Sequence, residues 1–268
     1  MNLTGMHVLL GASTAMHRLR QQIQQVASTQ APVLIHGEKG VGKTLVAELI
    51  RQESPRRERP FVTFGCIETP SDLLERELFG FEGIDSFGAW NVEAGWLAKN
   101  RGGTILFDEI AALAPSTQIK LLRLLEDRVF EPLGSGTPVS ADIRVLAATR
   151  RPLEQLVRSP TFRQDLYYRL TVFPIQVPPL RERKPDIPTL VGHFIEKYAR
   201  AHGRMVNGIL APGMAQLMRH RWPGNVRELE ECIEKAILAS TDGWLRIDDR
   251  CCPANFWLYA PVHDTPTA

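Results

Sequence analysis

Hydrophobic residues follow two different periods in the part of the chain up to about residue 180. Continuous hydrophobic runs that end at glycine or polar residues predict buried strands at 32–37, 59–66, 102–110 and 143–150. Hydrophobic residues spaced three and four apart predict helices at 17–28, 43–53 and 116–130, the last with Ser116 or Thr117 as its N-cap. Strands that alternate with helices and are hydrophobic throughout predict an α/β fold, with a parallel sheet covered on both faces.

The pattern changes after about residue 180, where the strand signals stop and only helical spacing remains. Helices are predicted at 186–203, 211–222 and 225–240, and Asn225 and Glu228 are a candidate reciprocal cap for the last one. We therefore expect an α/β domain over 8–178 and a small helical domain over 182–242. Residues 243–268 contain spaced prolines and are expected to form an irregular tail.

The segment FEGIDSFGAWNVEAGW, residues 81–96, fits neither the helical nor the strand period. It combines glycines with the aromatic residues Phe87, Trp90 and Trp96, which have no regular element to bury them. We expect an exposed loop that contacts another molecule, because aromatic side chains supply much of the contact area of protein interfaces. The alternative is that Trp90 and Trp96 pack the base of the loop onto the domain.

Composition and charge remove several functional classes. The net charge of +2 over 268 residues creates no global field that would attract DNA or an anionic membrane. The N-terminus does not resemble a signal peptide, and there is no hydrophobic run long enough to span a membrane. The four cysteines have no Cys-x-x-Cys spacing, which favours free thiols over a zinc site and agrees with a cytoplasmic protein.

The sequence GEKGVGKT, residues 37–44, fits the phosphate-loop pattern G-x-x-x-x-G-K-[ST] between a predicted strand and a predicted helix. In such a loop the backbone N–H groups surround phosphate oxygens. Lys43 would neutralise the β- and γ-phosphates, and the Thr44 hydroxyl would bind Mg²⁺. A chance glycine-rich turn is the alternative, but the context favours binding of ATP with Mg²⁺. The candidate nucleotide contacts are Gly37, Glu38, Lys39, Gly40, Val41, Gly42, Lys43 and Thr44.

Two carboxylates stand at the end of the predicted strand 102–110, in the sequence ILFDEI. At the carboxyl edge of a parallel sheet they would emerge beside the phosphate loop. Asp108 suits Mg²⁺, and Glu109 can orient or deprotonate the attacking water. Alone, the pair could equally cap the next helix, but its distance after a phosphate loop favours a catalytic function.

Arg163 and Arg169, in FRQDLYYRL, have no obvious partner in the predicted fold. One or both could reach a phosphate held by a neighbouring subunit, as an arginine finger does. From their spacing alone, surface ion pairs with Asp165 or Glu154 are the favoured interpretation.

The order of motifs along nearly the whole chain then indicates a family. GEKGVGKT, ELFG, GGTILFDEI, FRQDLYYRL, PPLRER and WPGNVREL together resemble the AAA+ domain of the bacterial enhancer-binding proteins, which activate sigma-54 RNA polymerase. The resemblance implies a P-loop AAA+ sheet flanked by helices and followed by a small helical lid. It also implies a hexamer-like ring with ATP at subunit interfaces and the sigma-54 holoenzyme as partner.

The same resemblance implies roles for individual residues. Asp108 and Glu109 become the hydrolytic pair, and Arg163 and Arg169 become fingers that act on the neighbouring subunit. Thr149 takes the sensor position at the end of a strand, and Arg227, at the start of the last helix, is a lid arginine that reports the nucleotide state.

Three departures from the family pattern bear on function. The family usually has asparagine where this chain has Gly65, and that side chain holds the catalytic glutamate. The sensor strand normally ends Thr-Asn, whereas here it ends Thr149-Arg150. The family's Gly-Ala-Phe-Thr-Gly-Ala loop, which contacts sigma-54, aligns with IDSFGA at 84–89, so the threonine is lost. The candidate contacts with a protein client are Ile84, Phe87 and Trp90.

Two functions of different classes therefore remain open. The first is an ATPase that remodels the sigma-54 holoenzyme. The second is a nucleotide-gated interaction protein with slow ATP turnover and a client other than sigma-54, which the altered loop and Gly65 favour. A small-molecule kinase with the same phosphate loop explains the paired arginines less well. No helix-turn-helix pattern follows residue 240, so we expect no sequence-specific DNA binding by this chain.

Overall fold

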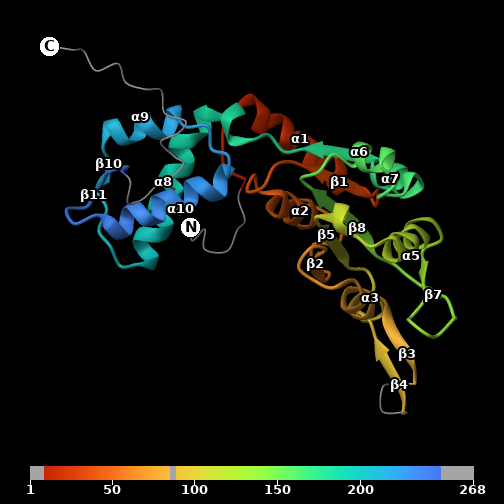
Figure 1. Ribbon diagram of the computed structural model, residues 1–268. Helices are drawn as coiled ribbons and strands as arrows, with labels where there is room; N and C mark the ends of the chain where they lie inside the picture. The colour runs from red at the N-terminus through yellow and green to blue at the C-terminus, as the bar shows by residue number, and fades with distance from the viewer. Residues whose placement is uncertain (1–8, 85–88, 249–268) are drawn as a thin grey trace. The chain divides into compact units, whose positions relative to one another are not determined.

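The computed structural model describes residues 9–84 and 89–248 (Figure 1). Among these residues the chain forms two compact units. The first contains 19–37 and 43–177, and the second contains 9–18, 38–42 and 178–248. Within the described residues, no helix is both long enough and hydrophobic enough to cross a membrane.

The first unit is built on a five-stranded sheet in the order β2-β5-β8-β1-β9, and all four strand pairs are parallel. The strands are β1 (Val33–His36), β2 (Phe61–Gly65), β5 (Thr104–Asp108), β8 (Arg144–Thr149) and β9 (Phe173–Gln176). The predicted α/β class with a parallel sheet is thus confirmed. The edge strand β9 has a proline in its middle and only a short hydrophobic pattern, so the sequence does not predict it.

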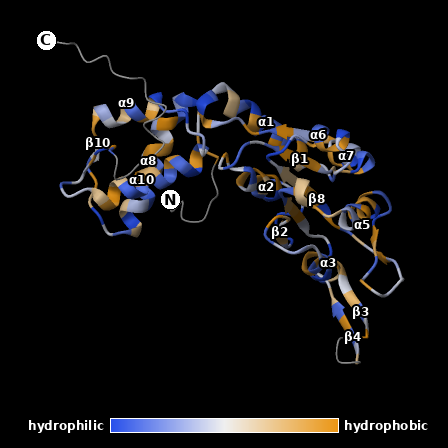
Figure 2. Ribbon diagram, in the orientation of Figure 1, coloured by the Kyte–Doolittle hydropathy of each residue, from blue (hydrophilic) through white to orange (hydrophobic). Residues whose placement is uncertain are grey.

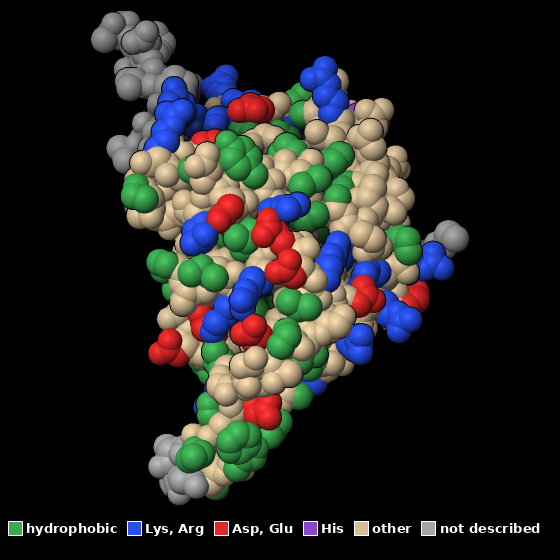
Figure 3. All heavy atoms as spheres, turned by 90° about the vertical axis from the view of Figure 1, so that its right-hand side faces the viewer, with side chains coloured by type: hydrophobic (Ala, Val, Ile, Leu, Met, Phe, Trp, Pro, Cys, Tyr) green, Lys and Arg blue, Asp and Glu red, His purple; other side chains and the backbone are tan. Residues whose placement is uncertain are grey.

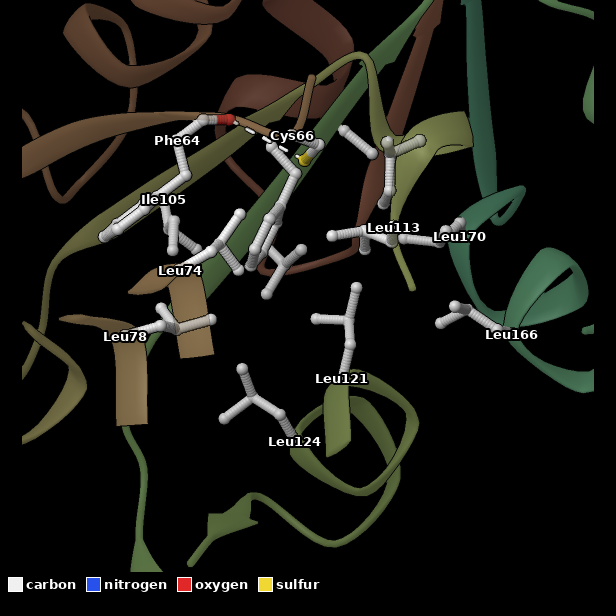
Figure 4. Close-up of a cluster of buried hydrophobic side chains, with 14 of the residues drawn as sticks. Phe64, Cys66, Leu74, Leu78, Ile105, Leu113, Leu121, Leu124, Leu166 and Leu170 are labelled. Carbon is white, nitrogen blue, oxygen red and sulfur yellow. Dashed lines mark hydrogen bonds between the residues drawn. The ribbon is translucent and has the colours of Figure 1, made fainter. Parts of the chain in front are cut away.

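Helices accompany the strands along the chain. They are α1 (Thr14–Ala27), α2 (Lys43–Gln52), α3 (Ser71–Phe79), α4 (Trp96–Lys99), α5 (Pro115–Glu126), α6 (Leu153–Arg158) and α7 (Gln164–Leu170), with a short 3₁₀ helix at Ile110–Ala112. Figure 4 shows leucines of α3, α5 and α7 converging with Phe64 and Ile105 from the sheet. Burial of these side chains is the main free-energy gain that holds the helices on the sheet.

The helix predicted at 116–130 ends at Glu126, so its last turn was wrong. Arg128 has φ 57°, a left-handed conformation that a continuing α-helix cannot contain. The chain then forms β6 (Val129–Phe130), which pairs antiparallel with β7 (Val139–Ser140).

The expected N-cap of α5 is also different, because Pro115 occupies the first turn and no side chain caps the helix. The hydroxyls of Ser116 and Thr117 instead donate to Oε1 of Glu75 on α3, at 2.9 and 2.6 Å. Lys120 pairs with the other carboxylate oxygen of Glu75. These bonds lower the pKa of Glu75, although burial acts in the opposite direction. The cluster ties α3 to α5.

The described residues of the segment, 81–84 and 89–96, are not the irregular loop that was predicted. They contribute to an antiparallel hairpin of β3 (Gly80–Ile84) and β4 (Trp90–Ala94), followed by α4. In Figure 1 the hairpin extends away from the sheet beyond α3. At its base, a Cβ atom on Gly95 would lie 2.3 Å from the backbone nitrogen of Gly80, so the two backbones approach too closely for any side chain. Sequence periodicity misses such short strands, because five residues give few repeats.

The second unit contains the long helices α8 (Ile187–Ala201) and α10 (Asn225–Ala239), with α9 (Ala211–Arg219) and two 3₁₀ helices at Leu180–Glu182 and Lys184–Asp186. The expectation that strands stop near 180 holds except for one short parallel pair, β10 (Gly208–Ile209) with β11 (Trp244–Leu245). The pair also places two residues of the expected irregular tail in a strand. The unit has its own hydrophobic core, in which Trp222 is fully buried.

Buried charges fix the position of the N-terminal segment within the second unit. Oδ1 of Asp186 accepts the backbone N–H groups of Ala12 and Ser13 at 2.8 and 2.9 Å, and Oδ2 accepts the Ser13 hydroxyl at 2.7 Å. Arg183, which is 2% exposed, donates to the carbonyl oxygen of Val41 at 3.1 Å. Buried charged groups are costly unless they are bonded, so these contacts specify where residues 9–18 and 38–42 lie.

Candidate nucleotide-binding site

Residues 37–44 connect the carboxyl end of β1 to the first residues of α2. The loop begins beside β8, because Gly37 donates its N–H to the carbonyl of Thr149 at 3.1 Å. Gly40 and Gly42 have φ values of 78° and 102°, which residues with a side chain rarely adopt. The glycines predicted from the motif therefore stand where the backbone requires them.

Gly40 is also restricted by its neighbours in the second unit. Its carbonyl accepts N–H bonds from Val226 at 3.0 Å and Arg227 at 3.3 Å, both at the start of α10. A Cβ atom on Gly40 would lie 2.2 Å from the carbonyl oxygen of Gly224. Only glycine fits at this position, and the start of α10 is thereby held against residues 38–42.

Glu38 and Asn225 form a polar network that the sequence did not predict. Arg181 donates two bonds to the carboxylate of Glu38, at 2.8 and 2.7 Å. Asn225 donates to Glu38 at 3.1 Å and to the carbonyl of Lys39 at 3.0 Å. The predicted reciprocal cap is therefore only half right: Asn225 makes no cap bond, whereas Glu228 accepts the N–H of Gly224 at 2.7 Å.

Lys43 is the central cation of the site and is only 8% exposed. Its ammonium group donates to the carbonyl oxygen of Gly37 at 3.0 Å and lies 3.5 Å from Oε1 of Glu109. The next residue, Thr44, is exposed in the first turn of α2. The motif thus places a buried cation and an accessible hydroxyl at the start of one helix.

Asp108 is the last residue of β5 and pairs in register with Gly65 of β2. Burial raises the pKa of Asp108, and the nearby carboxylates of Glu109 and Glu68 raise it further, while Lys43 acts in the opposite direction. Its Oδ1 accepts the N–H of Glu109 at 3.1 Å. The charged form of this carboxylate is therefore disfavoured in the folded protein, and a cation bound there would stabilise it.

Glu109 adopts a left-handed backbone conformation, with φ 55° and ψ 48°. Its backbone starts the 3₁₀ helix at Ile110–Ala112, but its side chain makes no cap bond, against the alternative that the pair only caps the next helix. One carboxylate oxygen faces Lys43, and the other accepts the N–H of Arg150 at 3.2 Å. The structure thus brings Lys43, Asp108 and Glu109 together, as the motifs predict.

Thr149 and Arg227 differ in how accessible they are. Thr149 is fully buried, and its hydroxyl accepts the N–H of Arg151 at 3.0 Å and lies 3.1 Å from the carbonyl of the same residue. The hydroxyl therefore holds the turn after β8. Arg227 is exposed in the first turn of α10, and its backbone N–H binds the carbonyl of Gly40.

Arg163 and Arg169 form ion pairs within the chain. Arg163 donates two bonds to Asp165, at 3.1 and 2.7 Å, and Arg169 donates to Glu126 at 2.8 Å. The surface-pair interpretation named the right partner for Arg163 but not for Arg169, since Glu154 instead accepts the hydroxyl of Tyr167. The two arginine side chains are 43% and 55% exposed.

The hairpin carries the candidate client contacts. Ile84 and Trp90 are cross-strand partners, 68% and 67% exposed, whereas Phe87 lies outside the described residues. Trp96 instead packs edge-to-face on Phe64, with ring centroids 6.3 Å apart. Figure 2 shows hydrophobic segments in the hairpin, and Figure 3 shows hydrophobic side chains at its lower end, next to the grey residues. The alternative that the two tryptophans pack the base of the segment onto the domain is therefore right for Trp96 and wrong for the exposed Trp90.

A parallel sheet whose strand β1 runs into this loop, with two carboxylates at the end of β5, has the architecture of the P-loop nucleoside triphosphatases. A family model described as the sigma-54 interaction domain matches residues 9–176, and one described as the AAA+ ATPase lid domain matches 181–250. The chain belongs to the sigma-54 interaction domain family, as its motifs indicated.

Individual relatives agree with this assignment. The chain is 47% identical to the nitrogen fixation protein AnfA of Azotobacter vinelandii over 87% of its own length and 44% of that protein. It is 43% identical to the transcriptional regulatory protein ZraR of Escherichia coli over 88% and 54%. A crystal structure of NtrX from Brucella abortus in complex with ADP matches with a TM-score of 0.86 at 36% identity, covering 97% of this chain and 58% of NtrX. The chain spans about half the length of these relatives.

We predict that replacing Asp108 by asparagine stabilises the nucleotide-free protein at neutral pH. Because the folded-state pKa is raised, the folded protein binds this proton more tightly than the unfolded chain does. The ionised carboxylate therefore lowers the free energy of unfolding above its folded pKa, and the cost disappears as the pH falls toward the unfolded value of about 3.9. Urea unfolding at pH 8 and at a pH close to the unfolded value, about pH 4, should show a gain for Asp108→Asn that shrinks at the lower pH.

The exposed Asp127, for which the same change should be nearly neutral, serves as the control. A loss of stability at pH 8 in Asp108→Asn would contradict the electrostatic account of this carboxylate.

Proposed function

We propose that this chain binds ATP with Mg²⁺ and hydrolyses it, as the AAA+ domain of a sigma-54-dependent activator that remodels RNA polymerase holoenzyme. The observation that carries the proposal is the buried ammonium of Lys43, set between the start of the phosphate loop and the carboxylate of Glu109. A buried cation at the start of a helix suits a polyanionic ligand. The crystal structures of NtrX in complex with ADP and with ATP support the choice of nucleotide.

The residues present fit this ligand. The N–H groups of residues 37–44 and the ammonium of Lys43 would bind the phosphates. The hydroxyl of Thr44 and the carboxylate of Asp108 are two oxygen ligands, which is what Mg²⁺ takes from a protein when phosphates and water complete its shell. When bound, the metal neutralises charge that develops on the phosphates. Among the described residues, no larger cluster of His, Cys, Asp or Glu offers another metal site.

Glu109 is the residue that we assign to the attacking water. Its carboxylate would orient the water and accept its proton, while Lys43 holds the charge of the phosphates. Glu109 and Lys43 lie 3.5 Å apart, so the base and the phosphate-binding cation adjoin one reaction centre. Thr149 and Arg227 complete the assignment, the first as the residue that fixes the turn after β8 and the second as the exposed lid cation.

Arg163 and Arg169 are proposed to act on the nucleotide of a neighbouring subunit in a ring oligomer. Both side chains are about half exposed and belong to one short segment around α7. Exposed ion pairs contribute little to stability, so each guanidinium can exchange its carboxylate for a phosphate at little cost. A hexamer-like ring would place this segment at a subunit interface.

The β3–β4 hairpin is proposed to contact the protein client. Ile84 and Trp90 form an exposed hydrophobic pair on an element that extends away from the sheet. Exposed hydrophobic groups of this kind are typical of surfaces that bind another protein. A second candidate function rests on the same hairpin, because residues 84–89 lack the threonine of the family loop. In that case the chain is a nucleotide-gated regulator with slow turnover and a client other than sigma-54.

Two substitutions separate nucleotide binding from hydrolysis. Lys43→Ala should abolish ATP binding, because the loop loses its buried cation. Glu109→Gln should bind ATP normally and stop turnover, because an amide cannot accept the proton of water. Calorimetry with ATP and a steady-state phosphate assay measure the two effects. Normal ATP affinity in Lys43→Ala, or normal turnover in Glu109→Gln, would refute the corresponding assignment.

Arg163→Ala and Arg169→Ala should each lower turnover by a factor on the order of 10³ if the side chains act as fingers. Mixing either variant with Lys43→Ala should restore part of the activity, because each protein supplies what the other lacks at a shared interface. Turnover per subunit of the unmodified protein should also rise with its concentration.

Arg158→Ala removes an exposed arginine at the end of α6 and should leave turnover unchanged. Absence of rescue in oligomers of normal size would show that the two arginines form surface ion pairs only.

A pull-down with ADP and aluminium fluoride, which together mimic the transition state, identifies the client. Because the threonine of the family loop is missing, we expect sigma-54 to be captured weakly or not at all. Trp90→Ala and Phe87→Ala should reduce whatever binding occurs, whereas Val139→Ala, on the separate β6–β7 hairpin, should not. Stable capture of sigma-54 that is lost in Trp90→Ala would prove the client expectation wrong and support the hairpin as contact surface.

A further inference from the structure

Glu109 is held from the side of β8, not from the side of β2. Strand β5 lies between these two strands, so the residues that follow it can be contacted from either neighbour. On the β8 side, the backbone N–H of Arg150 donates to Oε2 of Glu109 at 3.2 Å, and the guanidinium Nε lies 3.9 Å from the same oxygen. Lys43 faces the other carboxylate oxygen at 3.5 Å.

Among the residues that the structure describes, none on the β2 side makes a hydrogen bond or ion pair with the side chain of Glu109. Gly65, the last residue of β2, has no side chain, and the space beside it is taken by Glu68. A Cβ atom on Gly65 would lie 3.1 Å from Oε2 of Glu68. An ionised carboxylate only accepts hydrogen bonds, so Glu68 cannot take over the positioning of Glu109.

The backbone of Glu109 makes such positioning necessary. A left-handed conformation at a residue with a side chain costs free energy and persists only where surrounding contacts maintain it. The carboxylate also carries a negative charge next to the place where a triphosphate would bind. A cation beside Glu109 reduces that repulsion.

We propose that Arg150 is the residue that positions Glu109 for hydrolysis, in place of a side chain at position 65. The inference rests on the proposed ATP hydrolysis, with Glu109 as the base. Arg150 is 48% exposed and follows Thr149, whose carbonyl binds the first residue of the phosphate loop. Thr149 and Arg150 thus form a short segment that contacts both the phosphate loop, through Gly37, and the proposed base Glu109. Arg150 acts through Glu109 and is a positioning residue.

The contact can be tested without nucleotide. The thermal midpoints of Arg150→Gln, Glu109→Gln and the double variant form a cycle that measures whether the two side chains interact. We expect non-additive effects, with Arg150→Gln lowering the midpoint less when Glu109 is already glutamine. Strict additivity would overturn the proposal.

Turnover provides the second measurement. Arg150→Gln should lower kcat about tenfold and change KM for ATP less than twofold, because the base is misplaced while the phosphate loop is intact. The adjacent Arg151→Gln removes the same charge and should change neither. An unchanged kcat in Arg150→Gln, or a rise in KM alone, would overturn the inference. If Glu109→Gln itself turned over normally, the proposed hydrolytic function would fail instead.

Discussion

The burial of the Lys43 ammonium is the constraint on which the candidate site depends. A charge that is removed from water must be bonded, and Lys43 has the carbonyl of Gly37 and the carboxylate of Glu109 as partners. Gly37 is the first residue of the phosphate loop, and Glu109 directly follows β5. The side chain of Lys43 therefore links the phosphate loop to the end of β5. Both partners are oxygen atoms, the atom type that the phosphates of the proposed ligand would present, so binding would need little reorganisation around Lys43.

Much of the first unit could be predicted from the sequence, because buried parallel strands are hydrophobic at every position and the phosphate loop has a fixed spacing. The carboxylates Asp108 and Glu109 followed from the same reasoning, since parallel strands end at one edge of the sheet. Features that depend on the conformation of a single residue could not be predicted in this way. The end of α5 is set by the left-handed Arg128, and the sequence gives no signal for that conformation.

The contacts that the sequence missed are those between residues far apart in the chain. Arg181 and Asn225 bind Glu38, and Arg150 binds Glu109, yet none of these pairs has a regular spacing. In the sequence, Arg150 stood out only as a departure from the family pattern, and nothing in the sequence indicated a position for Glu68 beside Gly65. The hairpin was missed for a different reason: hydrophobic residues alternate over only five positions in β4 and do not alternate in β3.

The close approach of Gly80 and Gly95 fixes the two strands of the hairpin against each other at its base. The backbones are in contact at its base, and Arg76 of α3 donates two hydrogen bonds to Glu93 of β4, so the base of the hairpin is attached to α3 at two places. Helix α3 is in turn fastened to α5 through Glu75. In the proposed function, residues at the far end of the hairpin would select the client, while the residues at its base determine how the hairpin is attached to the domain, so the two properties would be encoded in different residues.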